Sequence, residues 1–313
     1  MITVGGFNTS IDKVMEMAEL RSGAVNRASS VRAYPGGKGL HVARAVGALG
    51  EPATLVGLID GPHRRFFEDA LAPAGVAFQG TPIPDEVRTC LTIHEAGGRR
   101  ITEVLEPGPE VDDARQRALS DAFLAAARNS AVAVLSGSVP RGFAEDVYAR
   151  LVVALRESGV RCLVDASGGL LRAAAEARPF LIKPNRQEVE ALLGERIEGV
   201  PAAAEAARRL CARGIAIVVV SLGAEGAILA SEGRVCHATA PPQPAANTVG
   251  SGDCLLAGVA VGLARGLPLD EILRLGVACG TANTLSAEHG YIRREHVDAV
   301  LPQVRTAWLR MGA

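Results

Sequence analysis

The stretch NTVGSGDCLLAGVA, residues 247–260, carries the strongest signal in the sequence. A glycine-rich turn, Gly250-Ser251-Gly252, leads directly into Asp253, and the residues that follow have the small and apolar content of a buried helix. Glycines bring backbone amide donors close together at a helix N-terminus, and a phosphate fits such a place. A carboxylate there is repelled by phosphate unless it has another task, such as accepting a proton from an attacking hydroxyl. Asp253 is therefore a candidate general base; the alternative is a helix cap.

Three further segments have features of phosphate or nucleotide contacts, although each is weak alone. PGGKGLHVARA, residues 35–45, is a second glycine-rich turn before an apolar helix, and close backbone packing would also explain it. In KPNRQE, residues 183–188, Glu188 has two possible roles. It could contact a magnesium ion through the water bound to that ion, or it could interact favourably with the dipole at a helix start. In SLGAEG, residues 221–226, the glycines would let a nucleotide approach the backbone.

Around these motifs, apolar β-branched runs alternate with helix-like stretches, which predicts a parallel sheet covered on both faces. The last third of the chain is predicted to be mainly helical, at 253–265, 269–288 and 294–309. The expected strands are 2–4, 53–58, 131–135, 161–164, 180–182 and 215–220, and the expected helices are 39–49, 64–71, 114–127, 144–157 and 201–213.

Two regions break the alternation and predict an antiparallel flap that stands off the main sheet. One is 25–34, and the other is the pair 88–93 and 99–105, joined by the turn-like residues 95–98.

Composition narrows the class of protein. With 313 residues, 48% hydrophobic and 21% charged, the chain can bury a large core, and its net charge of -1 argues against nucleic-acid binding. The first residues lack a signal-peptide pattern, and no stretch is apolar for long enough to span a bilayer. The six cysteines are scattered without metal-site spacing, so we expect free thiols and a reduced, cytoplasmic protein without a membrane or nucleic-acid partner.

The combined motifs resemble the phosphofructokinase-B branch of the ribokinase-like family, in order and spacing, over essentially the whole chain. The resemblance is carried by residues 36–39, 136–140, 183–188, 221–223 and 248–253. It implies an α/β fold, a ribokinase-like three-layer sandwich with a mostly parallel sheet and a small β-sheet lid. A single kinase domain over 1–313 is expected, with lid strands from about 12–35 and 86–106, and with a homodimer formed through the lid.

The resemblance also implies ATP and Mg2+ as cofactors and gives roles to individual residues. Asp253 would be the base, and Gly250, Ser251 and Gly252 would form the anion hole. Asn185 and Glu188 would serve the magnesium ion through water. The residues implied to bind the nucleotide are Lys183, Asn185, Ser221, Gly223 and Gly226, with Asn283 near the adenine end.

Within the family, the chain is similar to hexose-phosphate kinases that act on fructose 1-phosphate, fructose 6-phosphate or tagatose 6-phosphate. Asp12 would bind sugar hydroxyls, and Arg27 and Arg88 on the lid would hold the substrate phosphate. The remaining implied substrate contacts are Gly36, Gly37, Lys38, His41 and Ser138.

Two positions depart from the family pattern, since Thr9 follows Asn8 in place of proline and His41 stands where asparagine is expected. A histidine keeps a hydrogen-bonding group but changes charge near neutral pH. The alternative for His41 is a helix-surface residue with no ligand role.

Two other functions stay open from the sequence. One is a kinase for an unphosphorylated sugar or nucleoside, and the other is a relative that binds sugar or nucleotide without turnover. Asp253 beside the glycine turn argues against the second, because a pure binding protein needs no base there.

Overall fold

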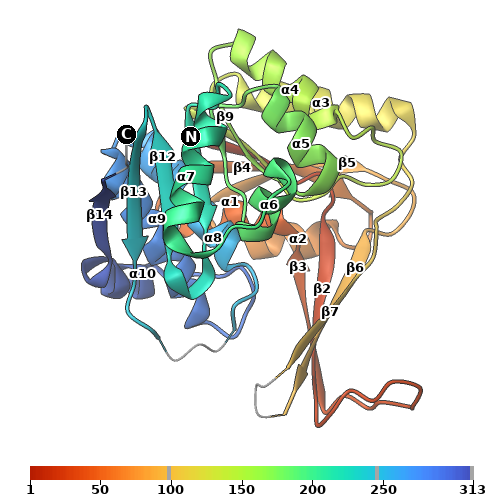
Figure 1. The fold of residues 1–313 in the computed structure, drawn as a ribbon. Coiled ribbons are helices and arrows are strands. Elements are labelled where there is room, and N and C mark those ends of the chain that lie inside the picture. Colours follow the sequence, from red (N-terminus) through yellow and green to blue (C-terminus); the bar gives the residue numbers. More distant parts are fainter. Residues whose placement is uncertain (97–99, 244–246, 311–313) are drawn as a thin grey trace.

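A ten-stranded sheet forms the centre of the computed structural model, which describes residues 1–96, 100–243 and 247–310 (Figure 1). Its order is β14-β13-β12-β11-β10-β9-β8-β1-β4-β5, parallel from β11 to β5 and antiparallel from β11 to β14. The strands are β1 Ile2–Gly5, β4 Ala53–Ile59, β5 Val76–Pro82, β8 Val132–Ser136, β9 Arg161–Asp165, β10 Leu181–Ile182, β11 Ile217–Ser221, β12 Ala227–Ser231, β13 Arg234–Thr239 and β14 Arg305–Leu309.

Helices cover both faces of this sheet, which confirms the predicted three-layer α/β sandwich (Figure 1). One layer contains α1, α8, α9 and α10, and the other contains α3 to α7. Among the described residues, no helix is long and apolar enough to cross a membrane. The helices are α1 Lys38–Ala48, α2 Arg64–Leu71, α3 Asp113–Ala127, α4 Val147–Glu157, α5 Gly168–Glu176, α6 Arg186–Leu193, α7 Gly199–Ala212, α8 Ser251–Ala264, α9 Leu269–Thr284 and α10 Arg294–Val300.

Helix α8 is buried on all sides from Asp253 to Leu263, so its position is fixed by the core. It packs closely on α9, since a Cβ added to Gly258 would lie 2.8 Å from the Cα of Gly276. Dense packing of this kind resists displacement. The N-terminus of α8, which carries the strongest sequence motif, is thereby held in one place.

A separate four-stranded sheet projects from the body as an arm, and this confirms the predicted small lid (Figure 1). Its order is β3-β2-β6-β7, and the outer pairs are antiparallel. The predicted antiparallel arrangement was wrong for the central pair, because β2 runs parallel to β6. The strands are β2 Ser10–Met17, β3 Ser30–Gly36, β6 Arg88–Glu95 and β7 Ile101–Leu105. Residues 97–99, part of the predicted turn and strand, lie outside the described residues.

The predicted C-terminal helix at 294–309 was wrong beyond Val300. Helix α10 ends there, a short 3-10 turn at Leu301–Gln303 contains Pro302, and β14 then pairs with β13 at the sheet edge. Proline lacks a backbone donor and ends the helix, and the remaining five residues gain backbone partners only as a strand. Helix α9 also ends earlier than predicted, at Thr284, and residues 285–293 connect it to α10.

Candidate active site

A cavity of about 950 Å³ opens where the carboxyl ends of the central strands face the lid. Ligands of α/β proteins bind at this end of a parallel sheet. The cavity collects most of the predicted site residues from segments far apart in the sequence. Those that line it are Asp12, Gly37, Lys38, His41, Arg88, Lys183, Asn185, Glu188, Ser221, Gly223, Gly226, Gly250, Ser251, Gly252 and Asp253.

The first turn of α8 is an open anion site. Gly250 is the N-cap residue with φ +82°, and no side chain within the described ranges caps this end. A Cβ on Gly250 would also lie 2.4 Å from the backbone nitrogen of Gly290, so only glycine fits. The Ser251 amide donates to the Thr248 carbonyl over 3.3 Å, whereas no acceptor for the Gly252 and Asp253 amides occurs among the described residues. These free amides and the helix dipole favour an anion. Asp253, the third helical residue, does not cap the helix, which leaves it available as a base.

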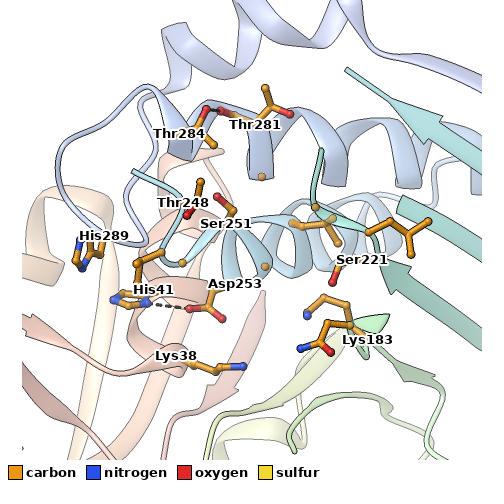
Figure 2. A pocket seen from close by; sticks show the side chains of 18 of the residues that line it. Lys38, His41, Lys183, Ser221, Thr248, Ser251, Asp253, Thr281, Thr284 and His289 are labelled. Carbon is orange, nitrogen blue, oxygen red and sulfur yellow. Dashed lines mark hydrogen bonds and ion pairs between the residues drawn. The ribbon is translucent and has the colours of Figure 1, made fainter. Parts of the chain in front are cut away.

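Two lysines face the same space from opposite sides, close to Asp253 (Figure 2). Lys183 Nζ would lie 3.5 Å from a Cβ on Gly252, so its charge is close to the first turn of α8. Lys38 Nζ lies 3.6 Å from Asp165 Oδ1, and Lys183 Nζ lies 3.3 Å from Asp165 Oδ2. The Asp165 carboxylate raises the pKa of Lys38, which stays charged. These ammonium groups suit a transferring phosphate.

Asp165 was missed from the sequence, although a signal existed. It directly follows the apolar run 161–164 at the carboxyl end of β9, where site residues of parallel sheets gather. The side chain is 1% exposed, and its carboxylate oxygens form ion pairs with the two lysines but accept no hydrogen bond of normal geometry among the described residues.

The opposite end of the cavity combines main-body and lid residues suited to a polar acceptor. The carboxylate of Asp12 lies over Gly36, where a Cβ would approach it to 2.1 Å, and Ser10 Oγ donates to Asp12 Oδ1 over 2.6 Å. Burial opposes ionisation of Asp12, but its contacts with His41 and Ser10 outweigh it and hold the pKa of Asp12 below its ordinary value. Arg88 projects from β6 into this region.

Glu103 on β7 also lines this end of the cavity and was not among the predicted site residues. Partial burial, together with the neighbouring Asp12 and Asp253 carboxylates, raises the pKa of Glu103. The available signal was its place in the strand-like range 99–105 of the predicted flap. The acceptor end is therefore polar and crowded with charge, as expected for a site that binds many hydroxyl groups.

The far end of the cavity is lined by less charged residues of β11, α9 and the segment 240–243. Ser221, Gly223 and Gly226, which were predicted to bind the nucleotide, lie here, together with Thr281 and Thr284, which were not among the predicted site residues. Figure 2 shows both threonines on α9, beyond Thr248 and Ser251 as seen from Asp253. Half-buried, mildly polar walls of this kind suit a nucleobase and ribose.

Asn185 and Glu188 are locked together at the start of α6 by a reciprocal capping box. Asn185 Oδ1 accepts from the Glu188 amide over 2.9 Å, and Glu188 Oε2 accepts from the Asn185 amide over 2.8 Å. Both residues also line the cavity. Hard oxygen donors in this number fit Mg2+ that keeps most of its water. No group of three or more metal-binding side chains occurs within the described ranges.

Four predicted residues do not line the cavity. Arg27 lies on the exposed segment between β2 and β3, and Gly36 lies beneath Asp12. Ser138 Oγ accepts a hydrogen bond from Asn8 Nδ2 over 3.0 Å. The predicted contact of Asn283 with adenine does not agree with its position, because the side chain is fully buried. Its Nδ2 donates to Val249 O and Ser251 Oγ, and its Oδ1 accepts from the Tyr291 amide. These hydrogen bonds hold the glycine-rich turn at the start of α8 from its buried side.

Comparisons with known proteins show the family to which the chain belongs. Residues 6–292 match the family model described as pfkB family carbohydrate kinase. The chain is 30% identical over 309 residues to a 1-phosphofructokinase of Bacillus subtilis, covering 99% of this chain and 100% of that protein. It is 34% identical to an ATP-dependent 6-phosphofructokinase isozyme 2 of Mycobacterium tuberculosis, over 93% of this chain and 84% of that protein. The structure of phosphofructokinase-2 from Escherichia coli in complex with substrates and products superposes with a TM-score of 0.90 at 27% identity, over 96% of this chain and 98% of that one.

Proposed function

Because the chain belongs to the pfkB family of carbohydrate kinases, we propose that it transfers the γ-phosphoryl group of ATP to a hydroxyl of a phosphorylated hexose. The family consists of ATP-dependent phosphotransferases. The observation that carries it is one cavity in which Asp253, an open helix N-terminus and two lysines face a lid arginine. The acceptors proposed are fructose 1-phosphate, fructose 6-phosphate and tagatose 6-phosphate.

The proposed chemistry follows from the order of groups along the cavity. The acceptor hydroxyl attacks the γ-phosphorus, a new O–P bond forms, and the bond to the β-phosphate oxygen breaks, with ADP leaving with the bonding electrons. The hydroxyl proton passes to Asp253. The α8 amides with Lys38 and Lys183 stabilise the charge on the transferring group. Asn185 and Glu188 would hold Mg2+ through water, and the ion would neutralise the nucleotide phosphates.

Arg88 supports an acceptor that carries its own phosphate. Its Nε atom is buried, with no hydrogen-bond partner among the described residues, while Nη1 donates to the Glu106 carbonyl over 3.2 Å. A buried charged donor without a partner is costly, so an anionic ligand at this place would complete it. The names of the relatives include fructose-phosphate kinases, and one Escherichia coli structure is a complex with fructose-6-phosphate.

A single assay separates this function from its alternatives. ADP release with Mg-ATP is measured across hexose 1-phosphates, hexose 6-phosphates, free hexoses and nucleosides. Preferred turnover of a hexose phosphate supports the proposal. Preference for a free sugar or a nucleoside would replace it by the second kinase function, and absence of sugar-dependent ADP release would favour a binding protein.

A homodimer through the lid is also proposed. Val31 on β3, with Ile101, Val104 and Leu105 on β7, exposes apolar surface along the lid arm. The pairing register places Val31 and Val104 on one face of the lid sheet and Ile101 and Leu105 on the other. Exposed apolar side chains on a sheet are typical of an interaction surface. Light scattering of the wild type should give twice the chain mass, and Val104→Lys should give the mass of one chain.

A further inference from the structure

His41 bridges the two carboxylates on which the proposed reaction depends. Its Nδ1 lies 2.8 Å from Asp253 Oδ2, and its Nε2 lies 3.5 Å from Asp12 Oδ2. Figure 2 shows the ring pointing at Asp253, with His289 behind it. The ring is 7% exposed and packs on Gly290, where a Cβ would approach its Cγ to 2.1 Å. The imidazole is therefore held in one orientation by its surroundings.

The charge of the ring follows from the number of its donors. A neutral imidazole has one N–H and one acceptor nitrogen, so one of its two nitrogens would present a lone pair to a carboxylate. The protonated ring donates from both nitrogens and lies between two negative groups. The geometry alone therefore favours the cation.

We propose that His41 is a positioning residue which, as an imidazolium, ties the base Asp253 to the sugar-binding carboxylate Asp12, so that turnover requires the protonated ring. The inference rests on the proposed function and adds a specific protonation state to it. It also explains what His41 does beyond contacting substrate.

In the proposed step one proton moves, from the acceptor hydroxyl to Asp253. The cation fixes Asp253 through Oδ2, and among the described residues no hydrogen bond reaches Oδ1. The acceptor hydroxyl gives its proton to Oδ1, while the proton on His41 Nδ1 stays where it is. When the ring becomes neutral, Asp12 and Asp253 lose the charge between them, and at least one of the two contacts is lost. The base is then no longer held in its productive orientation.

The groups around His41 separate its pKa from that of the neighbouring His289. Burial opposes the charged ring, but the hydrogen bonds and charges of Asp12 and Asp253 outweigh it and raise the pKa of His41 to about 9. Burial and the charge of His41 lower the pKa of His289 to about 4, so His289 is neutral over the relevant range. The titratable and charged groups around the ring are Asp12 on β2, Asp253 on α8, His289 on the loop after α9, Lys38 on its own helix, and Arg88, Cys90 and Glu103 on the lid.

The activity test is the pH dependence of kcat/KM for the hexose phosphate between pH 6.5 and 10. We expect the wild type to lose activity above about pH 9 and to approach a tenfold loss per pH unit, because one proton is essential. His41→Asn keeps an amide donor but does not titrate; it should be roughly tenfold to a hundredfold slower and lack this alkaline limb. His63→Asn is the matched control, since His63 pairs with Asp60 over 2.8 Å outside the cavity, and it should keep the wild-type profile.

A second measurement does not depend on turnover. The His41 ring proton resonance of the free protein, assigned by its loss in His41→Asn, should titrate near pH 9, and Asp12→Asn should lower that midpoint by a unit or more. A midpoint near the ordinary value of about 6.5 would overturn the inference. So would an alkaline limb that persists in His41→Asn. If no hexose phosphate is turned over while the resonance still titrates near 9, the proposed function fails and the charged bridge stands.

Discussion

Lys183 Nζ lies 3.3 Å from Asp165 Oδ2, and both side chains are almost fully buried. Lys38 approaches the other oxygen of the same carboxylate. One buried negative charge thus holds two cations that face the cavity. Removal of Asp165 would leave the charges of Lys183 and Lys38 without a counter-charge. A buried charge without a partner lowers stability more than the loss of the attraction alone.

Asp165→Asn should therefore lower both stability and activity. The expected loss is roughly 3 kcal/mol in the free energy of unfolding, because Lys183 stays buried without a counter-charge. Urea denaturation measures it. Asp69→Asn, which breaks the exposed pair of Asp69 with Arg65, is the control and should be neutral within about 0.5 kcal/mol. Equal, small effects in both variants would contradict the charge-holding role of Asp165.

Asp253→Asn should still fold and bind ATP, at a cost in stability because buried His41 loses one of its two counter-charges, while it reduces kcat by roughly a hundredfold to ten-thousandfold, the range for loss of a general base. Steady-state kinetics with thermal denaturation and nucleotide titration check this expectation. Turnover close to that of the wild type would remove Asp253 from the role of base.

Glu188→Gln should raise the Mg2+ concentration needed for half-maximal rate more than it changes the KM for the sugar. The amide oxygen of glutamine can still accept from the Asn185 amide, so the capping box at α6 is kept while the carboxylate charge is lost. Magnesium titrations at fixed ATP measure the effect. An unchanged titration would reduce Glu188 to a helix-capping residue.

Arg88→Ala should weaken use of hexose phosphates selectively. Loss of a charged hydrogen bond is worth roughly 1.5 to 3 kcal/mol, and any slow turnover of the free hexose should stay nearly unchanged. The ratio of kcat/KM values on the two acceptors is the measurement. Arg32→Ala, an exposed lid residue paired loosely with Glu16, is the control and should leave the ratio unaltered. Equal losses on both acceptors would mean that Arg88 supports the lid itself.

The pH dependence of stability should reveal His41 independently of catalysis. A raised folded-state pKa means that the native state holds the proton more tightly, so His41 stabilises the fold fully below pH 6.5 and loses this contribution as pH rises to about 9. The difference between wild type and His41→Asn in free energy of unfolding should therefore fall by about 3 kcal/mol across this window. Denaturant titrations at pH 6, 7.5 and 9.5 measure the difference. A difference that is constant with pH would contradict a charged His41 in the native state.

The sequence predicted the parts of the site that lie within one continuous motif. Gly250 to Asp253 needed no tertiary information, because the turn, the helix start and the carboxylate are adjacent in the chain. Asp165 and Glu103 could not be assigned in the same way, since each acquires its role from residues on other elements. Asn283 was assigned to the nucleotide although it faces inward, because helical spacing alone does not give the rotation of α9 about its axis. Strand β14 was missed because its partners on β13 lie about 70 residues earlier in the chain.

The lid and the helix that carries Lys38 and His41 share a very short connection. Strand β3 ends at Gly36 and α1 begins at Lys38, so Gly37 alone joins them, in a left-handed conformation with φ +98°. Because no longer segment separates them, a rotation of the lid should also move the first turn of α1. Gly37 is thus the shortest of the connections between the lid and the main body, and a residue inserted beside it should weaken the coupling between lid movement and the position of Lys38.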